Sequence, residues 1–190
     1  MSDRTVLLLS GPNLNLLGER EPEVYGSATL GDHVAGATAA AAARGIDLEH
    51  IQSNHEGELV DAIHAARGRC AGIVVNPGAF THYAWAIHDA LAAFDGPVVE
   101  LHLSNPAARE PWRHTSVVAP VAAGTIAGFG AAGYRMAVDA VADLLDGGAT
   151  VPPAGCRHWP WPIGWTPCVP CWTTPGLTPC WLPGPPTSAT

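Results

Sequence analysis

The strongest chemical signal in the sequence is a carboxylate and an imidazole two positions apart. Glu100 and His102 fall at the end of an apolar run of strand length that begins at Val98. Alternate side chains of a strand point to the same side, so the Glu100 carboxylate can hold and polarise the His102 imidazole. A lone histidine is more often a structural hydrogen-bonding group than a catalyst. A histidine paired in this way at a strand end indicates general acid or base chemistry.

Three other apolar runs are also followed by polar segments. Ser10 to Asn15 opens a long Gly/Pro-rich connection, which on its own is typical of a surface loop. In the second segment, Ser53 or Asn54 could cap the following helix, with Glu56 closing a capping box. The third segment runs from Asn76 to His82. Taken one at a time, the first two segments predict structure and not chemistry.

The elements that must position these segments alternate between strand and helix. Helix-length, alanine-rich stretches lie between most of the apolar runs, and this βαβ series predicts an α/β fold with a doubly wound, five-stranded parallel sheet in a three-layer sandwich. In such a sheet, ligands bind beyond the carboxyl ends of the strands. The strands are expected at Val6–Leu9, Leu48–Ile51, Gly72–Val75, Val98–Leu101 and Ser116–Val118, and the helices at about 29–44, 57–66, 82–94 and 131–146.

Composition excludes several classes of function. The chain has 190 residues, 47% hydrophobic and 14% charged, and its formal net charge is −8. This acidity disfavours binding of nucleic acid through a basic face. All nine basic residues are arginine, so chemistry on a lysine Schiff base or a P-loop lysine is excluded. No apolar stretch is long enough to cross a membrane, and the apolar run near Met1 is too short for a secretory signal, so we expect a soluble, cytoplasmic protein without a membrane partner.

The composition changes abruptly near Gly148. Residues 1–148 are expected to form one catalytic domain, and residues 149–190 an irregular Pro/Trp-rich tail, because residues 151–190 hold eleven of the eighteen prolines and five of the seven tryptophans. The tail contains the pair Cys168 and Cys171, which could be half of a zinc site. Structural zinc usually needs further ligands at set spacing, so no metal site is predicted.

Four long strings of the sequence, in order and in register, resemble one enzyme family. They are GPNLNLLGEREPEVYG (11–26), QSNHEGELVDAIH (52–64), NPGAFTHYAWAIHDAL (76–91) and VVELHLSNPAAREPWRHTSVV (98–118). Together they closely resemble type II 3-dehydroquinate dehydratase, over roughly residues 5–146. The resemblance implies a flavodoxin-like fold and the dehydration of 3-dehydroquinate to 3-dehydroshikimate by anti elimination through an enolate, a step of the shikimate pathway. It also implies that the enzyme uses no cofactor and no metal, and that it assembles as a dodecamer of four trimers.

The resemblance also implies the roles of individual residues. Tyr25 would be the base, although an ordinary tyrosine titrates near pH ~10, and Arg20 and Arg113 would favour its ionised form by charge attraction. His102, oriented by Glu100, would be the general acid. The resemblance implies catalytic roles for Asn13, Arg20, Tyr25, Glu100 and His102, and substrate binding by Asn76, His82, Asp89, Leu103, Ser104 and Arg113.

The resemblance implies three different ways in which these residues reach the substrate. Asn13 would hold the water that stabilises the enolate, and Arg113 with the backbone amides of Leu103 and Ser104 would bind the substrate carboxylate. Asp89 would reach substrate bound in the neighbouring subunit. From the residues alone, Asp89 is explained equally well as a solvated acid on a helix face.

The residues argue against two rival functions. Gly128 to Gly133 form a G-x-G-x-x-G string, but it comes near the end of the domain rather than after the first strand, so it predicts close helix packing rather than dinucleotide binding. A flavodoxin-like signalling module would need a lysine and an acidic cluster after its first strand, where this chain has Gly11, Pro12 and Asn13. A flavin-binding protein would copurify yellow. Tyr83 and Trp85 depart from the small polar pair expected after His82, with no chemical role assigned to them.

Overall fold

The computed structural model describes residues 4–19 and 26–147 of the chain. Within these residues, five parallel strands form one sheet in the order β2-β1-β3-β4-β5. This is the strand order of flavodoxin-like folds, so the predicted fold class is confirmed. The strands are β1 Thr5–Ser10, β2 Asp47–Gln52, β3 Gly72–Asn76, β4 Val98–His102 and β5 Gly124–Ala127, and the helices are α2 Leu30–Ala43, α3 Glu56–Ala66, α4 Trp85–Ala92 and α5 Ala131–Leu145.

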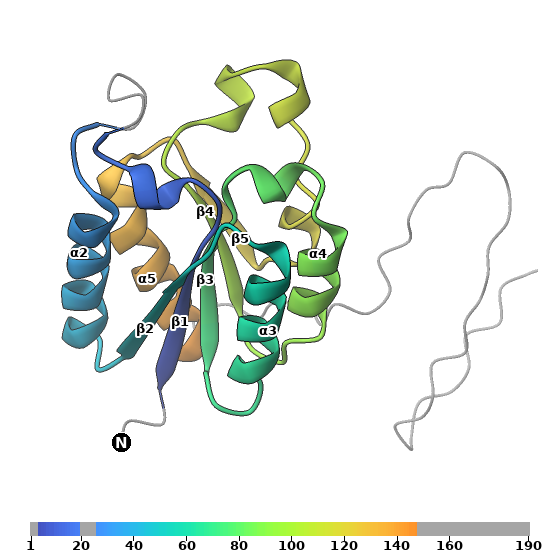
Figure 1. Cartoon of the computed structure of the whole chain (residues 1–190). Coiled ribbons are helices and arrows are strands. Elements are labelled where there is room, and N and C mark those ends of the chain that lie inside the picture. The colour runs from blue at the N-terminus through green and yellow to red at the C-terminus, as the bar shows by residue number, and fades with distance from the viewer. Residues whose placement is uncertain (1–3, 20–25, 148–190) are drawn as a thin grey trace, which may run out of the picture. The chain divides into compact units, whose positions relative to one another are not determined.

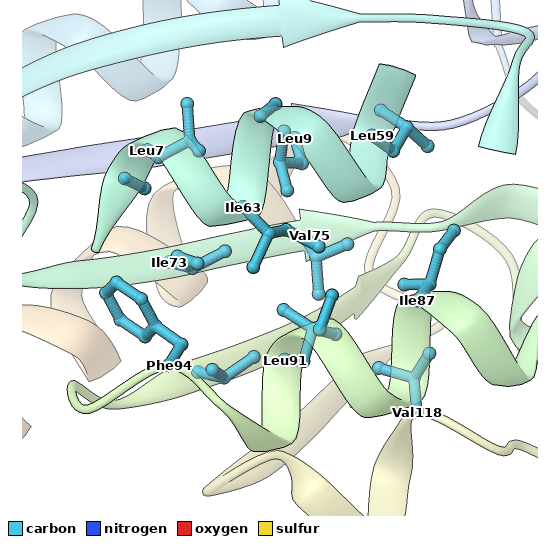
Figure 2. Packing of buried hydrophobic residues seen from close by; sticks show 14 of the residues in the cluster. Leu7, Leu9, Leu59, Ile63, Ile73, Val75, Ile87, Leu91, Phe94 and Val118 are labelled. Carbon is cyan, nitrogen blue, oxygen red and sulfur yellow. The ribbon is translucent and has the colours of Figure 1, made fainter. Parts of the chain in front are cut away.

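Helices cover both faces of the sheet. Figure 1 shows α2 and α5 against one face and α3 and α4 against the other. The alternation of side chains along β1 divides the core accordingly. Leu7 and Leu9 face α3 and α4, in the cluster drawn in Figure 2, whereas Val6 and Leu8 belong to the cluster with α2 and α5. The central strands are therefore apolar on both sides, which is typical of a parallel sheet covered by helices.

The predicted fifth strand is wrong. Ser116–Val118 does not pair with the sheet. The Ser116 hydroxyl instead accepts hydrogen bonds from the backbone amides of Val118 at 3.1 Å and Ala119 at 2.8 Å, and these bonds stabilise a turn of the chain. Pro120, which lacks a backbone donor, lies in the short 3₁₀ helix that follows, η5 Ala119–Val121. The actual edge strand, Gly124–Ala127, is short and partly exposed, so it carries no apolar run that could have been recognised.

The start of α3 also differs from the expectation. The residue that caps α3 is His55, so neither Ser53 nor Asn54 caps it and Glu56 closes no capping box. Ser53 lies two residues before the cap, where its hydroxyl accepts from the backbone amide of His55 at 2.9 Å and donates to Glu58. This arrangement leaves the Asn54 side chain available for a contact with another loop.

The helix predicted at 82–94 begins later than expected. A 3₁₀ helix, η2 Gly78–His82, precedes α4 and carries His82 at its last position. Among the described residues, no helix has both the length and the apolar character needed to cross a bilayer. The predicted tail at 149–190 and the Cys168–Cys171 pair lie outside the described residues.

Candidate active site

A pocket of about 110 Å³ opens at the carboxyl end of the sheet. The loops after β1, β3 and β4 line it, which is where a doubly wound sheet binds its ligands. Of the residues predicted for the site, it is lined by Asn13, Asn76, His82, His102, Leu103, Ser104 and Arg113. The fold thus brings together predicted residues from the loops after three separate strands.

The floor of the pocket holds the His102 imidazole. Its Nε2 lies 2.9 Å from Oε1 of Glu100, which is fully buried directly beneath it. A carboxylate accepts hydrogen bonds, so the proton of a neutral imidazole sits on Nε2. Nδ1 is then the nitrogen that can exchange a proton with a ligand.

Glu100 is ionised although no part of it reaches solvent. Burial raises the pKa of Glu100, but hydrogen bonds and charge attraction from His102, with hydrogen bonds from Thr81 and Ser116, outweigh burial and hold the pKa below its usual value. Ser116 Oγ lies 2.9 Å from Oε1, and Thr125 Oγ1 lies 3.2 Å from Oε2. The buried carboxylate can therefore stabilise the positive charge on His102 when its ring is protonated.

His82 is held in one tautomer at the pocket wall. Its Nδ1 lies 2.7 Å from the backbone carbonyl oxygen of Thr115. A carbonyl can only accept, so in the neutral ring Nδ1 carries the proton and Nε2 is an acceptor. The ring also makes an edge-to-face contact with Trp112, with centroids 5.2 Å apart.

Arg113 supplies positive charge to the pocket. Its guanidinium carbon lies 4.0 Å from the centroid of the Trp112 ring, and its Nε donates to Glu110 at 2.7 Å. Trp112 and Glu110 hold the guanidinium from two sides, while Arg109, which sequence reasoning did not single out, lines the same pocket. Two arginines at one pocket suit an anionic ligand such as a carboxylate.

Asn13, in the loop after β1, has an unusual backbone conformation. Its φ is +64°, in the left-handed region that asparagine tolerates better than most residues. Its backbone N–H donates to Asn54 Oδ1 at 2.9 Å. Gln52 Nε2 donates to the same oxygen at 3.2 Å, so the loop after β2 holds the loop after β1.

The close approach of two loops depends on a glycine. A Cβ at Gly11 would lie 2.4 Å from the backbone oxygen of Pro77, and the Gly11 amide donates to the Asn76 carbonyl at 2.8 Å. A side chain at Gly11 would force the loops after β1 and β3 apart. The loop that carries Asn13 therefore lies directly beside the one that begins after Asn76.

Four of the predicted site residues are not among the described residues that line the pocket. Glu100 lies buried against His102. Arg20 and Tyr25 lie outside the described residues. Asp89 is exposed on α4 and does not line the pocket of its own chain. Their predicted roles stay predictions.

The G-x-G-x-x-G string follows β5, one of the two edge strands of the sheet, and opens α5. A Cβ at Gly133 would lie 3.0 Å from Leu101 Cδ1, so this glycine lets α5 approach β4 closely. The prediction of helix packing is confirmed.

Known proteins resemble this chain along most of the described region. The sequence model of the family Dehydroquinase class II matches residues 4–142. A protein of Pseudomonas putida named 3-dehydroquinate dehydratase 2 is 58% identical over 140 residues, which cover 74% of this chain and 94% of the relative. The chain belongs to the class II dehydroquinase family. It is accordingly a hydro-lyase of the type II 3-dehydroquinate dehydratase kind.

Two further comparisons agree with this membership in the dehydroquinase family. A protein of Aspergillus clavatus named catabolic 3-dehydroquinase is 58% identical over 139 residues, which cover 73% of this chain and 93% of the relative. The crystal structure of type II dehydroquinase from Butyrivibrio crossotus matches with a TM-score of 0.71 and 44% identity, covering 73% of this chain and 97% of the other. The resemblance identified from the four sequence strings is confirmed.

Sequence reasoning missed the residues that support the site from behind. Thr81, Ser116 and Thr125 hydrogen bond to Glu100, and Asn54 holds the Asn13 backbone. Thr81 and Ser116 lie within the recognised strings, but their residue types carry no signal of a shared partner. Only the folded sheet brings them to one carboxylate.

Proposed function

We propose that this chain converts 3-dehydroquinate to 3-dehydroshikimate by an anti elimination of water through an enolate, and that it serves the shikimate pathway toward chorismate and the aromatic amino acids. The observation that carries the proposal is the His102 imidazole, held by a fully buried Glu100 at the floor of a pocket with two arginines. Elimination needs a base, a group that stabilises the enolate and an acid for the leaving hydroxyl.

The elimination proceeds through proton abstraction and then loss of the hydroxyl. The Tyr25 phenolate takes the proton from the carbon next to the ketone, and the electron pair moves onto the ketone oxygen. Asn13 holds the water that stabilises this enolate oxygen. The enolate then collapses and expels the hydroxyl of the next carbon, which leaves as water with a proton from His102. Passing the abstracted proton from Tyr25 back to His102 restores both groups.

Substrate binding is assigned to the rest of the pocket. Arg113 and the backbone amides of Leu103 and Ser104 bind the carboxylate, and Asn76 and His82 bind hydroxyl groups. Arg20, with Arg113, favours the ionised form of Tyr25. The pocket position of the described members of this set supports these roles.

The remaining parts of the proposal concern assembly and location. We infer a cytoplasmic homo-oligomer, a dodecamer of four trimers, in which Asp89 contributes to the site of a neighbouring subunit. The exposure of Asp89 on α4, away from the pocket of its own chain, supports this placement. We assign the catalytic domain to residues 1–148, and the tail expected at 149–190 stays a prediction.

The proposal is tested by adding 3-dehydroquinate to the purified protein and following the ultraviolet absorbance of the conjugated enone product. We expect turnover without added cofactor or metal, and no inactivation by borohydride in the presence of substrate, because the chain has no lysine to form an imine. Tyr25→Phe should bind substrate nearly as well and lose several orders of magnitude in kcat. Absence of product, or near-normal turnover by Tyr25→Phe, would contradict the proposal.

A further inference from the structure

The last rung of the sheet on the α2 and α5 face is polar. Ser10 at the end of β1 and Asn76 at the end of β3 are register partners, whereas the rung below them on that face is the apolar pair Leu8 and Val74. The exposed fraction of Ser10 is 0% and that of Asn76 is 2%. Buried polar side chains cost stability unless they are hydrogen bonded, so this rung needs partners from the helices above it.

Tyr134 of α5 supplies the partner. Its hydroxyl accepts from Asn76 Nδ2 at 3.4 Å and also hydrogen bonds to the Ser10 side chain. Burial raises the pKa of Tyr134, so the hydroxyl keeps its proton at neutral pH. The Tyr134 ring stacks on the His33 ring, with centroids 5.0 Å apart and planes 5° from parallel. The hydroxyl is therefore carried on an aromatic ring that packing holds in place.

Ser10 extends this hydrogen-bonded group to β2. Ser10 Oγ lies 3.0 Å from His50 Nε2, and burial lowers the pKa of His50. Ser10 therefore connects Tyr134 to His50 beneath the polar rung.

Two hydrogen bonds of Asn76 set which end of its carboxamide faces which neighbour. Asn76 Nδ2 donates one proton to Tyr134, and Asn76 Oδ1 accepts from the Gly78 backbone amide at 3.3 Å. The amide oxygen is thus turned toward Gly78, and one N–H of Nδ2 is left for the pocket that Asn76 lines.

We propose that Tyr134 is a positioning residue for Asn76, which it orients so that the second N–H of the carboxamide donates to an oxygen of the bound substrate. The proposal rests on the proposed function, because it names what one wall of the same pocket recognises. Tyr134 does not line the pocket and acts through Asn76.

The first test removes the hydroxyl and keeps the ring. We expect Tyr134→Phe to raise KM about fivefold and to change kcat less than about twofold, because substrate binding loses one oriented donor. In an Asn76→Ala background, the same substitution should leave KM unchanged, because the group that it positions is gone. Tyr83→Phe, the same change at an exposed tyrosine, is the matched control. An unchanged KM in Tyr134→Phe, or an equal effect in both backgrounds, would overturn the proposal.

The second test needs no substrate. In ¹⁵N-labelled protein, Tyr134→Phe should shift the Asn76 side-chain amide signals and speed their exchange with solvent, and unchanged signals would overturn the proposal. If Tyr134→Phe does not fold, Ser10→Ala replaces it in both tests, with a smaller expected rise in KM of about twofold. A wild-type protein that fails to turn over 3-dehydroquinate contradicts the proposed function alone, since the amide signals still report on Tyr134.

Discussion

At the scale of single residues, the site depends on a buried carboxylate surrounded by donors. Glu100 accepts from His102, Thr81, Ser116 and Thr125, which come from β4, η2, the turn before η5 and β5. An ionised carboxylate out of contact with water is stable only when such partners replace its hydration. Hydrogen bonding and charge attraction from His102, with hydrogen bonds from Thr81 and Ser116, hold the pKa of Glu100 below its usual value, and the charge on Glu100 can stabilise a protonated His102 ring.

Neutralising this carboxylate should reduce catalysis more than binding. In Glu100→Gln the side chain keeps its shape but no longer offers a negative charge to protonated His102. We expect kcat to fall about 100-fold or more with a smaller change in KM, because the charge matters most when the proton is transferred. Steady-state kinetics with 3-dehydroquinate measure this. Glu58→Gln, the same change at a carboxylate that lies on α3 and is not among the residues lining the pocket, should retain normal kcat; a kcat of Glu100→Gln within threefold of wild type would contradict the interpretation.

Asn54 should act through the backbone of Asn13. Asn54→Ala removes the acceptor that holds Asn13 at φ +64°, so Asn13 loses its fixed position at the pocket. We expect kcat to fall about tenfold with little change in KM, since Asn13 is assigned to the enolate. Asn54→Asp keeps an acceptor oxygen and should restore most of kcat. Equal losses in the two variants would show that the hydrogen bond to Asn13 is not the cause.

At the scale of elements, the central strands were predictable because both of their faces are buried. β1 and β3 are continuous apolar runs because helices cover them on both sides, whereas β5 is an exposed edge that contains Gly124 and Thr125 and was missed. The pairing of Glu100 with His102 followed from strand periodicity alone. Contacts between distant segments, such as Asn54 with Asn13, depend on where loops meet and leave no local pattern in the sequence.

The packing of α5 on β4 predicts that the same substitution at two helical glycines changes the unfolding free energy by different amounts. Gly133→Val places methyl groups against Leu101, where even a Cβ would lie 3.0 Å from a buried side chain, and should cost about 1–3 kcal/mol of unfolding free energy. Gly36→Val, at an exposed position of α2 with nothing within 4 Å of the added Cβ, should change it by less than about 0.5 kcal/mol. Urea denaturation of both variants measures the difference, and equal stabilities would show that α5 is free to shift.

At the scale of the whole molecule, acid should destabilise the fold in two stages. Burial lowers the pKa of His33 and of His50, so the unfolded chain takes up their protons first as the pH falls through about 6.5. The pKa of Glu100 is lowered despite burial, because its hydrogen bonds and the nearby His102 favour the ionised form, so its contribution is present at neutral pH and is lost only below about pH 4.3. Both stages have the same sign: stability decreases as the pH decreases.

The histidine stage can be tested by itself. His33→Phe keeps an aromatic ring at the position that stacks on Tyr134 and removes the group that takes up a proton. The unfolding free energy should therefore fall less steeply between pH 7 and pH 5. Each proton taken up contributes a slope of at most about 1.4 kcal/mol per pH unit. Urea midpoints across this range measure the slope. His64→Phe, at an exposed position of α3, is the control; if His33→Phe leaves the slope unchanged, His33 is not one of the groups responsible.

Assembly is where Asp89 can be distinguished from an ordinary surface acid. Asp89 lies exposed on α4 and outside the pocket of its own chain, as expected for a residue that completes a neighbouring site. Mixing Asp89→Ala subunits with Tyr25→Phe subunits should then restore part of the activity, because some hybrid sites combine an intact Tyr25 from one chain with an intact Asp89 from the next. Activity after unfolding the two variants together and refolding them, compared with each variant refolded alone, measures this. If Asp89 is only a solvated helix acid, Asp89→Ala has wild-type kcat and KM by itself, and mixing adds nothing beyond its own share of the activity.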